Sequence, residues 1–183
     1  LQVENLNPEL NNNILKRYTV TDKADGIRKL LFINSKGIIY LINQNLYVQY
    51  TGISVKHEDI FNTIIDGEHI LYDKNGNYIN LYAAFDIYFI KYKEKLVDIR
   101  KEHFQEKRYK FLNKFIDSIN KELKDSQTYT NGVTFQVKEF YFIENKISMK
   151  DNCRTLLDKI NSNEYPYNTD GLIFSSSVLG VGM

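Results

Sequence analysis

The feature that most constrains the fold of this chain is a succession of β-type segments separated by turn residues. Each segment is rich in Ile, Tyr, Phe, Val and Thr, and short polar turns at 35–37 and 75–77 separate neighbouring segments. Asn75-Gly76 is a strong hairpin signal, because both residue types tolerate the positive φ of a tight turn. The pattern predicts antiparallel hairpins over residues 18–22, 27–34, 37–42, 46–50, 63–72 and 78–90.

After residue 100 the pattern changes to helical spacing. Phe104, Phe111, Phe115 and Ile119 recur at spacings of four and seven in a highly charged background. They predict an amphipathic helix whose aromatic stripe faces the core rather than a cofactor. A strand over 135–142, a shorter helix near 150–160 and a strand over 172–175 follow. We therefore expect one α+β domain over residues 18–183, with antiparallel sheets flanked by helices, after a polar lead-in arm over residues 1–17.

Composition excludes several classes of protein. Lys and Arg total 24 against 23 Asp and Glu, so the net charge of +1 gives no reason to expect a long polyanion as partner. The single cysteine, Cys153, cannot form an internal disulfide or a thiolate metal cluster, which favours a reducing compartment. No apolar run approaches the roughly 18 residues of a membrane span.

Residue types that carry chemistry occur at four places. Residues 23–28, Lys-Ala-Asp-Gly-Ile-Arg, place a lysine at a strand end, an Asp-Gly turn, and an arginine on the returning strand of the expected hairpin. Glu68, Asp86 and Asp170 interrupt apolar strands, where a carboxylate is costly without a cationic partner or a metal. Taken alone, each of these residues is more simply interpreted as a side chain exposed to solvent. Four such segments in one chain, in this order, indicate a functional site.

These segments, in their order and spacing, resemble the covalent nucleotidyltransferase superfamily of mRNA capping guanylyltransferases and ATP-dependent polynucleotide ligases. The first motif, Lys-x-Asp-Gly-x-Arg, is matched in full by residues 23–28. The later matches are Asp66-Gly67-Glu68, Ala84-Phe85-Asp86-Ile87-Tyr88-Phe89 and Asp170-Gly171-Leu172-Ile173-Phe174. Longer strings, at 80–88 and 169–174, are most similar to capping enzymes of the poxvirus and giant-virus type.

The resemblance implies a role for each matched residue. Lys23 would be the nucleophile that attacks the α-phosphorus of GTP and forms a lysyl-GMP. Arg28 would hold the ribose or a phosphate, Glu68 would accept hydrogen bonds from the ribose hydroxyls, and Phe85 would lie against the purine. Because only an uncharged amine can attack, we expect the pKa of Lys23 to be lowered by a cationic neighbour such as Arg28 or by a divalent metal.

The same resemblance suggests how the remaining polar residues contribute. Asp170, together with Glu68, would help to hold Mg²⁺ or Mn²⁺, whereas Asp25 and Asp86 would orient the turn and the groups around the nucleotide. Lys138 precedes the last motif and is a candidate to reach a phosphate, although an exposed lysine at a sheet edge is the simpler interpretation. The histidines at 57, 69 and 103 lack metal-ligand spacing and are expected to be structural.

The chain also departs from the family pattern. The family's fifth motif, Lys-x-Lys, and its oligonucleotide-binding-fold domain would follow Phe174, and residues 175–183 contain neither. We interpret the chain as an excised piece of a longer parent, with feeble or no activity alone. The alternatives are the adenylation domain of an ATP-dependent RNA or DNA ligase, or a noncatalytic fragment of the same fold.

The resemblance to capping enzymes also implies partners and a location. The expected partners are GTP, the 5′-diphosphate end of RNA and other capping domains of the parent chain, and no membrane is expected. The expected location is the cytoplasm, which for a viral protein means the host cytoplasm, a viral factory or the virion.

Overall fold

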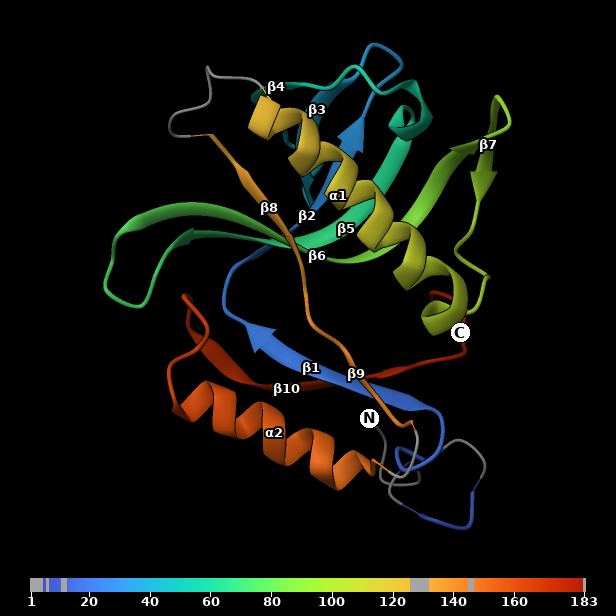
Figure 1. Cartoon of the computed structure of the whole chain (residues 1–183), viewed down its shortest axis with the longest axis vertical. Coiled ribbons are helices and arrows are strands. Elements are labelled where there is room, and N and C mark those ends of the chain that lie inside the picture. The colour runs from blue at the N-terminus through green and yellow to red at the C-terminus, as the bar shows by residue number, and fades with distance from the viewer. Residues whose placement is uncertain (1–4, 6, 11–12, 126–131, 145–146, 183) are drawn as a thin grey trace.

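The protein is α+β and contains two β-sheets, as the sequence predicts (Figure 1). The structure, a computed structural model, describes residues 5, 7–10, 13–125, 132–144 and 147–182. The small sheet has the strand order β10-β1-β9, and the large sheet has the order β4-β3-β2-β5-β6-β7 with β8 paired to β6. The strands are β1 (Tyr18–Ala24), β2 (Ile27–Ile33), β3 (Ile38–Asn43), β4 (Val48–Ser54), β5 (Thr63–Tyr72), β6 (Tyr78–Tyr92), β7 (Lys95–Asp98), β8 (Thr134–Val137), β9 (Tyr141–Phe142) and β10 (Thr169–Ser176).

The large sheet has one face in the core and one face available for function. Helix α1 (Tyr109–Asp125) packs across the first face, where Leu31, Ile65 and Ile87 are fully buried (Figure 1). Since side chains alternate between the faces of a strand, residues next to these in sequence point the other way. The opposite face therefore carries Arg28 and Glu68, which lie directly across from each other on β2 and β5.

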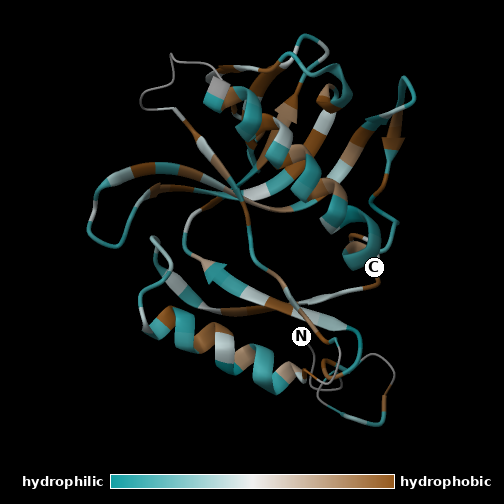
Figure 2. Cartoon of the chain, in the orientation of Figure 1, coloured by the Kyte–Doolittle hydropathy of each residue, from teal (hydrophilic) through white to brown (hydrophobic). Residues whose placement is uncertain are grey.

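The small sheet is covered on one side by α2 (Met149–Asn161). Val20, Leu156 and Tyr167 form a second hydrophobic cluster, to which Leu81 and Ala83 of the large sheet also contribute. Both helices alternate hydrophilic and hydrophobic bands, as Figure 2 shows, which is typical of helices with one buried face. Ser148 caps the start of α2 by accepting a hydrogen bond from the Asp151 backbone N–H.

The expected opening hairpin is wrong. Strand β1 pairs with β10 and β9 in the small sheet, whereas β2 pairs with β3 and β5 in the large sheet. Asp25 and Gly26 therefore carry the chain from one sheet to the other rather than reversing it within a hairpin. An Asp-Gly pair is compatible with a hairpin turn and with a passage between two sheets. Which of the two forms therefore depends on the distant strands that pair with β1.

The segment 135–142 also differs from the single strand expected. It divides into β8, which runs parallel to β6, and β9, which runs antiparallel to β1, with Lys138 at the break. The sequence pattern also missed β7, the 3₁₀ turn Glu58–Ile60 and a π-helical turn over Phe104–Arg108 that precedes α1. At the turn between β5 and β6, only Gly76 has a positive φ, of 82°.

Two further expectations concern the ends of the chain and the membrane. Of the expected lead-in arm, residues 1–4, 6, 11 and 12 lie outside the described residues, and residues 7–10 and 13–17 consist mainly of turns and bends. No helix within the described ranges has the length and apolar character needed to cross a membrane.

Candidate active site

Lys23 and Asp170 meet at the centre of the candidate site. The Lys23 Nζ lies 2.6 Å from the Asp170 Oδ2, and about half of each side chain is exposed. The pairing of β1 with β10 creates this contact, because Asp22 lies opposite Leu172 and Ala24 lies opposite Thr169. The first and last sequence motifs, 147 residues apart, are thus joined by adjacent strands.

The pKa of Lys23 is raised, not lowered as expected. The hydrogen bond to Asp170 is the largest cause, and the charges of Asp170, Asp25 and Glu68 act in the same direction. The expectation that Arg28 lowers this pKa is wrong for the free protein, because the Arg28 guanidinium is held by a carboxylate of its own. The Lys23 amine therefore has a carboxylate beside it that favours the charged form.

Arg28 is held by Asp66, a partner that the sequence motifs did not predict. The Asp66 carboxylate is fully buried and accepts hydrogen bonds from Nε and Nη2 of Arg28, the closest at 2.6 Å. Asp66 also accepts a short hydrogen bond from the Tyr88 hydroxyl. The pair raises the pKa of Arg28 and fixes its guanidinium plane, while 52% of its side chain remains exposed.

Glu68 lies on the same face as Arg28 and within electrostatic range of two lysines. Its side chain is partly buried, and burial raises its pKa, whereas the charges of Lys138, Lys23 and Arg28 oppose that rise. Residues 66 and 68 share a face because they are two positions apart on a strand. The structure therefore brings Glu68 together with Lys23, as the motif order suggests.

Phe85 and Asp86 lie at a bulge in β6. Ala84 pairs with Gly67 and Asp86 pairs with Asp66, so Phe85 is the extra residue between two paired positions. Phe85 is partly buried. Bulges re-aim side chains next to binding sites, which is compatible with the stacking role expected for Phe85.

Asp86 is paired with Arg108, which the sequence motifs did not predict as a site residue. The Arg108 Nε lies 2.8 Å from Asp86 Oδ1 and its Nη2 lies 3.1 Å from Oδ2. Arg108 is only 4% exposed and also donates to backbone carbonyls from Nη1, to Glu102 at 2.6 Å and to Leu179 at 3.2 Å. The cationic partner that the sequence predicts for Asp86 is therefore an arginine on the π-helical turn.

Lys138 is buried, so the interpretation of an exposed edge lysine is wrong. Its side chain is 3% exposed, and its Nζ lies 3.3 Å from Oδ2 of the fully buried Asp22. The Nζ also donates a hydrogen bond to the backbone carbonyl of Asp22 at 2.5 Å. Binding of a nucleotide by Lys138 stays a prediction.

Asp25 is exposed and His69 is buried in a hydrogen-bonded position. Asp25 is exposed, and its backbone N–H donates to the Asn168 carbonyl at 2.9 Å. His69 is buried between Asn80 and Lys29, where its Nε2 lies 2.8 Å from Asn80 Oδ1. Burial lowers the pKa of His69, which agrees with a structural role.

The carboxylates near Lys23 suit a divalent metal only in part. No group of three or more His, Cys, Asp or Glu side chains within the described residues has the geometry to hold a metal ion. Asp170 and Glu68 offer two carboxylates, and Mg²⁺ commonly binds one or two carboxylates together with substrate phosphates. Two such carboxylates would leave the remaining ligand positions to phosphates and water, and metal binding by Asp170 and Glu68 stays a prediction.

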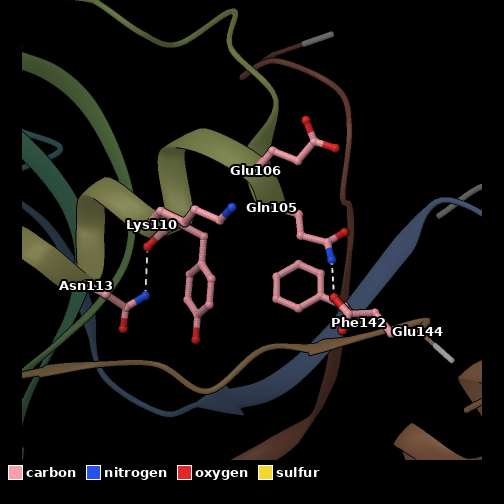
Figure 3. Close-up of a pocket in the computed structure, with 7 residues that line it drawn as sticks. Gln105, Glu106, Lys110, Asn113, Phe142 and Glu144 are labelled. Atoms are coloured by element: carbon pink, nitrogen blue, oxygen red, sulfur yellow. Dashed lines mark hydrogen bonds between the residues drawn. The ribbon is translucent and has the colours of Figure 1, made fainter.

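Pockets lie both beside the candidate site and away from it. One, of about 290 Å³, is lined by Arg28, Leu30, Ile42 and Tyr88 and so adjoins the candidate site. Figure 3 shows another, of about 510 Å³, between the start of α1 and β9, with Tyr109 and Phe142 in its lining and a hydrogen bond from Gln105 to Glu144. None of the residues predicted from the motifs lines this second pocket.

Gly26 lies against Glu68, which gives a testable consequence. A Cβ at position 26 would meet Glu68 Cγ at 2.8 Å and the His69 carbonyl oxygen at 2.9 Å. We expect Gly26→Ala to lower the free energy of unfolding by about 1–3 kcal/mol, because backbone and a functional side chain must shift to make room. Urea denaturation measures this change, and an unaltered midpoint would contradict the close approach.

The chain is similar in sequence to mRNA capping enzymes. The family model for the mRNA capping enzyme catalytic domain matches residues 4–179. A probable mRNA-capping enzyme of Acanthamoeba polyphaga mimivirus is 36% identical over 120 residues, which are 66% of this chain and 10% of that protein. The chain thus spans about a tenth of the length of this curated relative.

Solved structures show the same fold at low sequence identity. A mycobacterial DNA ligase D complexed with ATP is 13% identical with a TM-score of 0.51, and the match covers 90% of this chain and 50% of that chain. The ligase domain of DNA ligase D from M. tuberculosis has the same identity and coverage and a TM-score of 0.52. These likenesses confirm the ligase and capping-enzyme fold predicted from the sequence. With a family model that extends over nearly all of its residues, this chain belongs to the mRNA capping enzyme catalytic-domain family.

Proposed function

We propose that this chain is the nucleotidyltransferase core of an mRNA guanylyltransferase, which takes GMP from GTP onto Lys23 and passes it to the 5′-diphosphate end of RNA. The observation that carries the proposal is the contact between Lys23 and Asp170, 2.6 Å long, within a chain that matches the capping-enzyme family. Membership of that family favours GTP over ATP.

In the first step, the Lys23 Nζ attacks the α-phosphorus of GTP. A P–N bond forms, the bond from the α-phosphorus to the bridging oxygen breaks, and pyrophosphate leaves with the bond's electron pair. The amine must lose a proton before it attacks, and Asp170 Oδ2 is the oxygen placed to accept it. In the second step, a terminal oxygen of the RNA diphosphate attacks the same phosphorus, the P–N bond breaks, and the amine regains a proton.

Other residues of the chain hold the nucleotide in this proposal. The Arg28 guanidinium, oriented by Asp66, binds the ribose or a phosphate through its exposed part. Glu68 accepts hydrogen bonds from the ribose hydroxyls, and Phe85 stacks on the purine, a contact worth roughly 1–3 kcal/mol. Asp170 and Glu68 would hold a divalent cation, which when bound neutralises negative charge that develops on the phosphates.

Other capping domains of a parent chain are proposed only as partners of this domain. The mimivirus relative is about ten times longer than the matched region, which supports other capping domains in a parent chain. We propose the host cytoplasm or a viral factory as the location on the same analogy.

The proposal is tested with a longer protein that also carries the fifth motif, by supplying α-³²P-labelled GTP or ATP with Mn²⁺ and following label on the denatured protein. We expect acid-labile, alkali-stable label from GTP, as a phosphoramidate requires, and release of that label when 5′-diphosphate RNA is added. Label from ATP alone would assign the chain to the ligase class instead. No label from either nucleotide, in a protein that also carries the fifth motif, would indicate a noncatalytic domain.

A further inference from the structure

Lys138 links the two sheets directly beside the proposed nucleophile. Its backbone N–H donates to the Ala84 carbonyl of β6 at 2.8 Å, and its Nζ donates to the Asp22 carbonyl of β1 at 2.5 Å. Ala84 precedes Phe85, and Asp22 precedes Lys23. One residue therefore spans from the strand that carries the proposed base-stacking ring to the strand that carries the amine.

The position of this link follows from a gap in the small sheet. Strand β9 pairs with β1 only at Thr19 and Val20, so the same edge of β1 lacks a strand partner at Asp22. The Thr21 hydroxyl continues the contact by donating to the Glu139 carbonyl at 2.7 Å. The ammonium of Lys138 then supplies the donor that a strand would have given to the Asp22 carbonyl.

Both charged side chains of this link are buried. Asp22 is 0% exposed and Lys138 is 3% exposed, with Nζ and Oδ2 3.3 Å apart. Asp22 Oδ2 and the hydroxyls of Tyr165 and Tyr167 are buried without a hydrogen-bond partner in the described residues. A buried ion pair of this kind adds little net stability compared with apolar residues of the same size, although it can fix a unique arrangement.

We propose that the Asp22–Lys138 pair is a positioning device that fixes the peptide carrying Lys23 relative to β6. This inference rests on the function proposed above. Lys138 acts through the Asp22 carbonyl and not on the nucleotide, so its loss should slow transfer to Lys23 and leave nucleotide affinity unchanged. A misplacement of about 1 Å in a reacting group can slow a reaction roughly 100-fold.

The test replaces the ion pair by apolar residues of similar size. The double variant Asp22→Leu/Lys138→Met removes the link without leaving a buried charge unpaired, so it is expected to remain folded. Its single-turnover rate of lysyl-GMP formation at saturating GTP should fall about 10- to 100-fold. Its affinity for α,β-methylene GTP, which cannot transfer GMP, should stay within about twofold of the original.

A matched control and a second variant complete the design. Lys159→Met removes a partly exposed ion pair with Glu139, next to Lys138 in sequence, and should leave both the rate and the affinity unchanged. Asp22→Asn/Lys138→Gln keeps the side-chain shapes as a neutral pair and leaves no buried charge unpaired, so it retains the fold if the apolar double variant does not. It should slow transfer at least about fivefold, because the ammonium that donates to the Asp22 carbonyl is lost.

Each outcome decides the inference. A folded variant with the original rate would show that the pair has no positioning role. An equal loss of rate and of affinity for the methylene analogue would place Lys138 on the nucleotide instead, and would also overturn the inference. All of these rates are measured in a protein that also carries the fifth motif. If that protein without substitutions forms no lysyl-GMP at all, the proposed function fails first, and that result is distinct from either of these.

Discussion

Replacement of Lys23 by alanine is expected to abolish covalent attachment of nucleotide, with a loss of at least about 10³-fold in the rate of adduct formation. The change removes the only atom proposed to form the P–N bond. Lys23→Arg should fail equally, because a guanidinium stays protonated and cannot attack phosphorus. Denaturing gels of protein incubated with labelled GTP and Mn²⁺ measure the adduct.

The same substitution should leave the fold intact. The Lys23 and Asp170 side chains are 48% and 51% exposed, and solvent-exposed ion pairs add little to stability. The urea midpoint of Lys23→Ala should therefore match the original. Lys36→Ala, at an exposed position in the turn between β2 and β3, is the matched control and should keep full labelling. Labelling that survives in Lys23→Ala would show that another group is the nucleophile.

Loss of Arg108 should have the largest effect on stability. Arg108→Met leaves the Asp86 carboxylate buried without its bidentate partner and removes the donor from the carbonyls of Glu102 and Leu179. Burial already raises the pKa of Asp86, and Arg108 opposes that rise. We expect the free energy of unfolding to fall by about 3–5 kcal/mol, as is usual when one member of a buried pair is removed.

Urea denaturation measures this loss, and a surface pair provides the comparison. Arg100 forms a similar bidentate pair with Asp98, but both side chains are more than 40% exposed. Arg100→Met should therefore leave the urea midpoint nearly unchanged. If the two variants shift the midpoint equally, burial of the Asp86–Arg108 pair is not what makes it important.

The local elements and the residues of the motifs could be predicted from the sequence. Strands β2 to β6 follow segments rich in Ile, Tyr, Phe, Val and Thr between turn residues, and α1 follows the spacing of Phe111, Phe115 and Ile119. The pairing of Lys23 with Asp170 confirms the expectation that an acid in an apolar strand has a cationic partner. Such features depend on short-range pattern or on motif order, both of which are visible in one sequence.

Features that depend on distant pairing could not be predicted in the same way. The turn at Asp25-Gly26 is equally compatible with a hairpin and with a passage between sheets, and only the pairing of β1 with residues 169–176 decides between them. The burial of Lys138 likewise depends on where β9 stops along β1. Position 138 alone, between two short strands, carries no signal of that contact.

The cationic partners of Asp86 and Asp66 also could not be predicted from the sequence alone. Asp86 pairs with Arg108 and Asp66 pairs with Arg28, and both pairs join elements whose relative placement is fixed only by the assembled sheet. For Asp66 the only signal is that positions 66 and 68 share a face; the place of position 28 across from 68 follows from the pairing of β2 with β5. For Arg108 none existed, since a π-helical turn, not the α-helical spacing, places it.

The pairing of β1 with β10 also determines when the site can come into being during synthesis. Residues 18–24 emerge from the ribosome early, whereas their main partner, residues 169–176, emerges some 150 residues later. The large sheet can assemble from neighbouring strands in the meantime, since contacts close in sequence form fastest. A nascent chain that stops before residue 169 would thus leave β1 without its main partner and Lys23 without Asp170, so nucleotide transfer would begin only after translation of this region is complete.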